Sequence, residues 1–95
     1  MSEPNLHLST TQTVDVGSSS AATANAFHSE TFTVRVVSTA DAHIAFGTSP
    51  TATADNLILP ANTVEFFKIS APGTTKLAAL KVSGHGTLRV TEMTV

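Results

Sequence analysis

The 95-residue sequence contains no cysteine, tryptophan or tyrosine, and only 13% of its residues are charged. Without cysteine, neither disulfide bonds nor thiolate metal sites can support the fold. Without Trp and Tyr, the chain lacks the broad amphipathic rings that usually stack on sugars. Since an average domain has about 25% charged residues, this surface is rich in uncharged side chains and suited to lying against other protein.

The five basic residues are scattered along a chain whose formal net charge is −2. Nucleic-acid binding normally requires clustered Lys and Arg, because phosphate neutralisation supplies most of the affinity. We therefore expect no nucleic-acid partner. The first residues lack the basic start and apolar run of a signal peptide, and no apolar run is long enough to cross a bilayer. We expect synthesis in a cytosol and no membrane partner.

Chemistry-bearing motifs are sparse. The four histidines form neither His-x-His nor His-x-x-x-His, and no Gly-x-Ser-x-Gly sequence is present to raise a nucleophile. Glu30, Glu65 and Glu92 are the carboxylates that glycoside hydrolysis would need, but each occupies a strand position expected to face solvent. We therefore expect no enzymatic activity, no metal site and no cofactor.

Alternation of apolar and polar residues predicts an all-β domain. The clearest strand is 31–37, in which Phe32, Val34 and Val36 share the face expected to be buried. Further strands are predicted at 11–16, 42–46, 57–59, 63–70, 77–82 and 87–95, with a flexible loop at 17–25 and a surface loop at 48–56.

Seven or eight short antiparallel strands at roughly ten-residue spacing predict a small β-sandwich, either jelly-roll-like or immunoglobulin-like. Residues 11–95 form this single domain. Residues 1–10 are weakly patterned and form either an N-terminal arm or a frayed terminus.

Five residues are candidates for contact with a neighbouring molecule. Because Phe66 and Phe67 are adjacent in one strand, one of them faces away from the core, unless a bulge buries both. Phe27, in the loop before residue 31, is either a core side chain, which we favour, or a contact residue. Pro50 stiffens the 48–56 loop and, with Thr51, forms the other candidate contact, the alternative being a loop without a partner.

The expected core is thin. A chain of this length buries only about two-thirds of the surface that its unfolded form exposes, and much of its apolar content is alanine. Small domains without disulfides or metals often depend on association with other protein. We therefore expect a homo-oligomer.

Three segments of the chain are distinctive: His-Ile-Ala-Phe-Gly-Thr-x-Pro-Thr-Ala-Thr at 43–53, Leu-Pro-Ala at 59–61 and Thr-Leu-x-Val-Thr-Glu-Met at 87–93. With them, residues 31–93 resemble the small accessory structural proteins of tailed bacteriophage virions. This resemblance implies a capsid decoration or cement protein that binds the outer capsid surface and stabilises the shell, with a trimer favoured. The implied partner is the major capsid protein or another virion structural protein, and the implied location is the virion, after synthesis in the host bacterial cytoplasm.

Other functions are compatible with the same pattern. The nearest alternative is a neck or tail adaptor, or a module associated with a tail fibre. The other is a β-sandwich that binds a receptor or a glycan, which the absence of Trp and Tyr disfavours.

Overall fold

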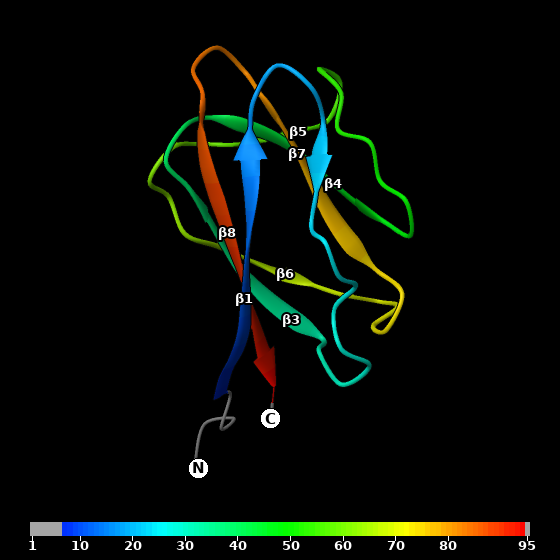
Figure 1. Cartoon of the computed structure of the whole chain (residues 1–95). Helices are drawn as coiled ribbons and strands as arrows, with labels where there is room; N and C mark the ends of the chain where they lie inside the picture. The colour runs from blue at the N-terminus through cyan, green and yellow to red at the C-terminus, as the bar shows by residue number, and fades with distance from the viewer. Residues whose placement is uncertain (1–6, 95) are drawn as a thin grey trace.

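The computed structural model of the protein describes residues 7–94, which form two antiparallel sheets and no helix (Figure 1). The predicted fold class, a small all-β sandwich, is confirmed. The strands among the described residues are β1 (His7–Val16), β2 (Ala21–Ala22), β3 (Thr33–Ser38), β4 (Ala42–Gly47), β5 (Leu57–Leu59), β6 (Glu65–Lys68), β7 (Lys76–Lys81) and β8 (Gly86–Thr94).

The strand order is that of a jelly roll. Sheet A has the order β1-β8-β3-β6, and sheet B has the order β2-β7-β4-β5. Strands from the two halves of the chain pair in succession: β1 with β8, β2 with β7, β3 with β6, and β4 with β5. This is the pairing of one long hairpin folded over on itself into two sheets. Of the two topologies that the sequence left open, the structure has the jelly roll.

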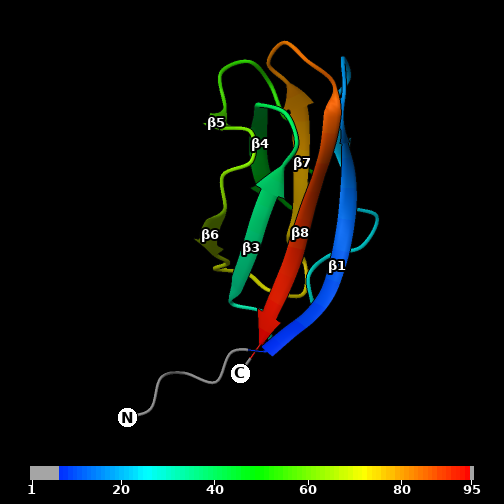
Figure 2. The same ribbon diagram turned by 90° about the vertical axis from the view of Figure 1, so that its left-hand side faces the viewer.

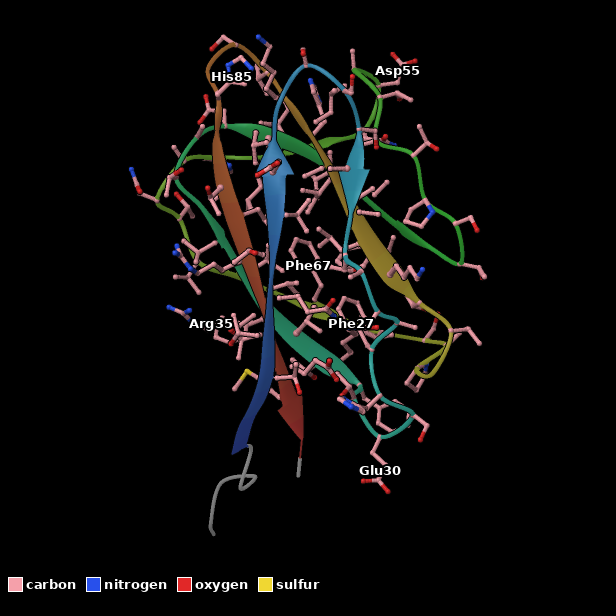
Figure 3. The ribbon with its side chains drawn as sticks, viewed as in Figure 1. Phe27, Glu30, Arg35, Asp55, Phe67 and His85 are labelled. Carbon is pink, nitrogen blue, oxygen red and sulfur yellow. The ribbon has the colours of Figure 1, made fainter. Side chains whose placement is uncertain are left out.

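The core lies between the two sheets and takes alternate residues from their strands. Phe27, from the loop before β3, is only 1% exposed, and its ring centroid lies 6.5 Å from that of Phe46, which is 5.4 Å from that of Phe67. Figure 3 shows Phe27 and Phe67 between the sheets. The favoured interpretation of Phe27 as a core residue is therefore confirmed. The strand β6 has no bulge that buries both of its aromatic residues, because Phe66 is 57% exposed while Phe67 packs against the core.

Two boundaries differ from the sequence prediction. β1 begins at His7 and Leu8 pairs with Met93, so residues 7–10 belong to sheet A and not to a separate arm. The remainder of that expected arm, residues 1–6, lies outside the described residues. The predicted loop at 17–25 contains β2, where Ala21 pairs with Ala79, because small side chains allow this segment to complete the edge of sheet B.

The expected burial of Phe32 is wrong. Val34 and Val36 are fully buried as predicted, but β3 begins only at Thr33, and Phe32 is 59% exposed. Thr31 is buried instead, and its hydroxyl hydrogen-bonds to a buried carboxylate, that of Glu92. The hydrogen bond between Thr31 and Glu92 therefore positions the start of β3, whereas alternation alone predicted that the Phe32 ring would be buried.

The 48–56 loop lies across the outer face of sheet B. The amide of Ala52, which is buried, donates a 2.9 Å hydrogen bond to the Ser20 hydroxyl, and Nδ1 of His43 lies 3.0 Å from the carbonyl oxygen of Asn56. The residues before and after His43 and Ala78 face the core, so His43 and Ala78 point to the outer face of sheet B. Both are nevertheless buried. The loop therefore contributes to folding, beyond the role of a surface excursion that we expected.

Candidate binding surface

Exposed apolar residues occur on the two edge strands of one side of the sandwich, β5 and β6, and in the segments beside them. Figure 2 shows this side opposite β1. The segment before β3 ends there too, because the Ile69 amide, just after β6, donates a 2.8 Å hydrogen bond to the Phe32 carbonyl. We call this the β5–β6 side, and its exposed apolar residues are Phe32, Leu57, Ile58, Val64 and Phe66.

The opposite side of the sandwich is closed by polar contacts. The Gln12 side chain donates to the Asn25 carbonyl and accepts from the Asn25 amide, both at 3.0 Å, which joins β1 to the segment after β2. The Lys81 amide also donates to the Gly17 carbonyl at 3.0 Å. Exposed apolar residues can mark interaction surfaces, and most of those among the described residues lie on the β5–β6 side, so this side is the candidate binding surface.

The outer edge of β6 is open. Among the described residues, β6 pairs only with β3, in the register Val34–Phe67 and Val36–Glu65. The bond from Ile69 to Phe32 identifies the alternate residues Glu65 and Phe67 as those whose backbone groups point toward β3. The backbone groups of Phe66 and Lys68 therefore point away from the sheet. Such an edge is a template for pairing with another strand.

Basic residues accompany the exposed ring of Phe66. Arg35 is its cross-strand partner on β3, and Lys68 follows it on the same face of β6. Figure 3 shows Arg35 pointing away from the core of the sandwich. Within the described part of the chain, the only ion pair joins His28 to Glu92, so neither Arg35 nor Lys68 is held by a carboxylate there. Aromatic residues and arginine are the types enriched in the centres of protein interfaces.

The structure does not bring the five sequence-predicted contact residues together. Phe66 is exposed on sheet A, whereas Thr51 is exposed and Pro50 half-buried on the loop that crosses sheet B. Phe27 is buried and Phe67 packs against the core, so neither presents its ring as a contact surface.

Four exposed apolar residues of the β5–β6 side were not among the predicted contacts: Phe32, Leu57, Ile58 and Val64. A signal for Ile58 was present. Consecutive apolar residues in a three-residue strand point to alternate faces, so the Leu57–Leu59 strand could not bury all of its side chains in one core.

An open hollow of about 290 Å³ lies between the ends of β4 and β6. Residues that line it include Phe46, Gly47, Lys68, Ile69 and Thr75, and Lys68 is the only titratable side chain of the lining. A single cationic side chain beside hydroxyl and apolar groups offers no acid–base pair. The hollow therefore adds to the β5–β6 side a recess whose lining carries one cationic side chain.

Glu92 was expected to face solvent, and that expectation is wrong. It is 1% exposed, and its Oε1 atom accepts hydrogen bonds from the Thr31 hydroxyl at 2.6 Å and from the His28 amide at 2.9 Å. Nδ1 of His28 lies 2.8 Å from the same oxygen. Oε2 is buried and has no hydrogen-bond partner among the described residues. Glu30 and Glu65 are exposed, as expected.

The surroundings of Glu92 act on its ionisation in opposite directions. Burial raises the pKa of the Glu92 carboxyl, but the bonds from Thr31 and from the amide and ring of His28, together with the charge on the His28 ring, outweigh it and lower the pKa below its ordinary value. The carboxylate therefore joins the loop before β3 to β8. Because one oxygen is engaged by its neighbours and the whole side chain is shielded from solvent, the geometry supports a structural role.

Within the part of the chain that the structure describes, no group of three or more His, Cys, Asp or Glu residues is placed to hold a metal ion. That same part contains no helix long and apolar enough to cross a membrane. No family model, curated protein or solved structure matches the chain.

Proposed function

We propose that the protein is a structural accessory of a tailed-bacteriophage virion, most specifically a capsid decoration or cement protein. The observation that carries the proposal is the presence of exposed apolar residues along the β5–β6 side, together with an open strand edge, in a small domain with no disulfide. Such a surface is suited to lying against other protein. The resemblance of residues 31–93 to phage accessory proteins supplies the kind of partner.

The segments that carry the resemblance have structural roles. Residues 43–53 form most of β4 and the start of the loop over sheet B, and residues 87–93 form most of β8, in the middle of sheet A. The resemblance therefore rests on the framework of the fold. Eight-stranded jelly rolls occur in viral capsid proteins, which supports the proposal by analogy of fold alone.

The mechanism is binding without catalysis. Each subunit lies on the outer capsid surface and contacts the major capsid protein or another virion structural protein through its apolar side. One such contact is weak, but repetition over a regular shell, with subunits also touching each other, makes the layer hold by avidity. A shell bound in this way resists expansion because loss of one contact leaves its neighbours in place.

The proposal is tested by adding the protein back to capsid shells whose binding sites for it are unoccupied. Purified protein is added to shells of the encoding phage that were assembled without it, and shells that already carry it serve as the control. We expect saturable binding to the first shells alone and a higher temperature of shell disruption after binding. Binding to isolated necks or tails, with none to shells, would assign the protein to an adaptor instead.

A glycan-binding role is the second candidate, because jelly rolls also occur in lectins. The described hollow lacks Trp and Tyr, since the whole chain does. A glycan array tests this directly, and saturable binding to one glycan class that competes with free sugar would favour it over the capsid role.

A further inference from the structure

We infer that two copies of this chain associate through the outer edges of their β6 strands, which pair antiparallel about a two-fold axis. The pairing joins the two A sheets, each of four strands, into one continuous sheet. It involves only copies of this chain, so it can be tested without a virion, and it gives a dimer in place of the trimer that the resemblance implies.

The backbone supplies the first reason. Phe66 and Lys68 direct their amide and carbonyl groups away from β3, as the register of β6 requires. An identical edge turned by 180° presents the same groups in reverse order, so donors meet acceptors. In an antiparallel pair, a residue whose backbone groups cross the gap lies opposite another residue of the same orientation. Phe66 must therefore lie opposite either Phe66 or Lys68 of the second copy.

The side chains select the first of these registers. With Phe66 opposite Phe66, the two exposed rings form a cross-strand aromatic pair, and Val64 lies opposite Lys68 of the second copy, whose aliphatic stem covers it. The other register places Phe67 on the axis, but its ring already packs against its own core. Only the first register covers the 57% exposed ring of Phe66 with another ring.

The charges at the ends of β6 supply the second reason. Glu65 begins the strand and Lys68 ends it, and both side chains are exposed. Antiparallel pairing brings the acidic end of each strand beside the basic end of the other, whereas parallel pairing would align like charges. Glu65 and Lys68 lie on opposite faces of the sheet, so the charges form no direct pair, but the antiparallel orientation is the one that keeps like charges apart.

The absence of cysteine permits a direct test, because a single introduced cysteine can form a disulfide only between two molecules. In the inferred register, the two Phe66 positions lie about 5.5 Å apart between Cα atoms, which is within the range of a disulfide. The two Lys68 positions are offset by four residues, about 13 Å along the strands. Val82, an exposed apolar residue after β7, serves as the control.

Under mild oxidation, we expect the F66C variant to form a covalent dimer at least ten times faster than the K68C and V82C variants do. Sedimentation of the wild-type protein should show a concentration-dependent dimer. The variant K68P should be monomeric with an unchanged circular dichroism spectrum, because proline removes an amide that points away from β3. If K68P fails to fold, F66D provides the same comparison, since its side chain is exposed.

Four results would overturn the inference. They are a monomer at every concentration, a trimer of the kind that the resemblance implies, a dimer that persists in folded K68P or F66D, and V82C cross-linking as fast as F66C. Rapid cross-linking of F66C together with dissociation of K68P would establish the β6 pairing and its register.

Discussion

The Thr31 hydroxyl donates a 2.6 Å hydrogen bond to Oε1 of Glu92 and so joins two segments 61 residues apart in the sequence. The same oxygen accepts the amide of His28, the residue after Phe27. One buried carboxylate thereby holds the whole entry to β3, with Phe27 inserted between the sheets and Phe32 left outside. The contact explains where the aromatic residues of this region lie.

The carboxylate should contribute measurably to stability. Replacing Glu92 by Gln removes the charge from the hydrogen bonds with Thr31 and His28, and bonds to charged groups contribute about 1.5–3 kcal/mol. We expect the free energy of unfolding at neutral pH to fall by about 2 kcal/mol, as measured by urea denaturation. Glu30→Gln, at an exposed position, is the matched control and should change it by less than about 0.5 kcal/mol.

This stabilisation depends on pH in a defined direction. Because the folded-state pKa of Glu92 is lowered, its contribution is fully present above the unfolded-state pKa and is lost as the pH falls through the folded-state pKa. The stability difference between wild type and Glu92→Gln should therefore shrink on acidification. A difference that grows in acid would show that burial dominates and that the pKa is raised.

Substitution of the polar Thr31 should destabilise the fold more than substitution of the aromatic Phe32, the reverse of the usual order. Thr31→Val keeps the shape but removes a bond to a buried carboxylate, so we expect a loss of about 1.5–3 kcal/mol. Phe32→Ser changes an exposed side chain and should cost less than about 0.5 kcal/mol. Thermal and urea unfolding of both variants check this, and a larger loss for Phe32→Ser would contradict the placement of the ring.

The buried Phe27 and the exposed Phe66 should contribute very differently to stability. Phe27→Ala leaves a cavity beside Phe46 in the core and should destabilise the fold by about 3–5 kcal/mol. Phe66→Ala should leave the stability of the isolated subunit within about 0.5 kcal/mol, because the ring is exposed. Unfolding is measured at a concentration low enough to keep the protein monomeric, and similar losses for both variants would contradict the assignment.

Gly86, at the start of β8, approaches a neighbouring turn too closely to accept a side chain. A Cβ atom there would lie 2.6 Å from the Thr39 hydroxyl oxygen and 2.8 Å from the Ala40 Cβ. We expect Gly86→Ala to lower the free energy of unfolding by about 1–3 kcal/mol. At Gly84, in the connection between β7 and β8, an added Cβ meets no atom within 4 Å, so Gly84→Ala serves as the control. Equal melting temperatures for the two variants would show that the turn moves aside.

The sequence predicted the fold class because alternation is strong where strands have one buried face. Val34 and Val36 are examples. Alternation could not place Thr31 and Phe32, since the burial of Thr31 depends on Glu92, a partner far away in the chain. The same distant contact made Glu92 appear to be an ordinary solvent-facing residue.

The candidate surface was predicted only in part. Adjacent phenylalanines in a regular strand must face opposite ways, which identified the pair but not which ring was exposed. The structure shows that Phe66 is exposed and Phe67 packs against the core. That Phe66 and the exposed residues of β5 lie on the same side of the sandwich could not be predicted, because it depends on strand order, which places β5 and β6 at edges on that side.

The central proposal is that this chain decorates a capsid, and its copy number in purified particles of the encoding phage tests that most directly. Quantitative mass spectrometry against the major capsid protein gives the ratio. A decoration protein should be present in hundreds of copies per particle, at a fixed ratio to the capsid protein. Its absence from purified particles would contradict the virion role.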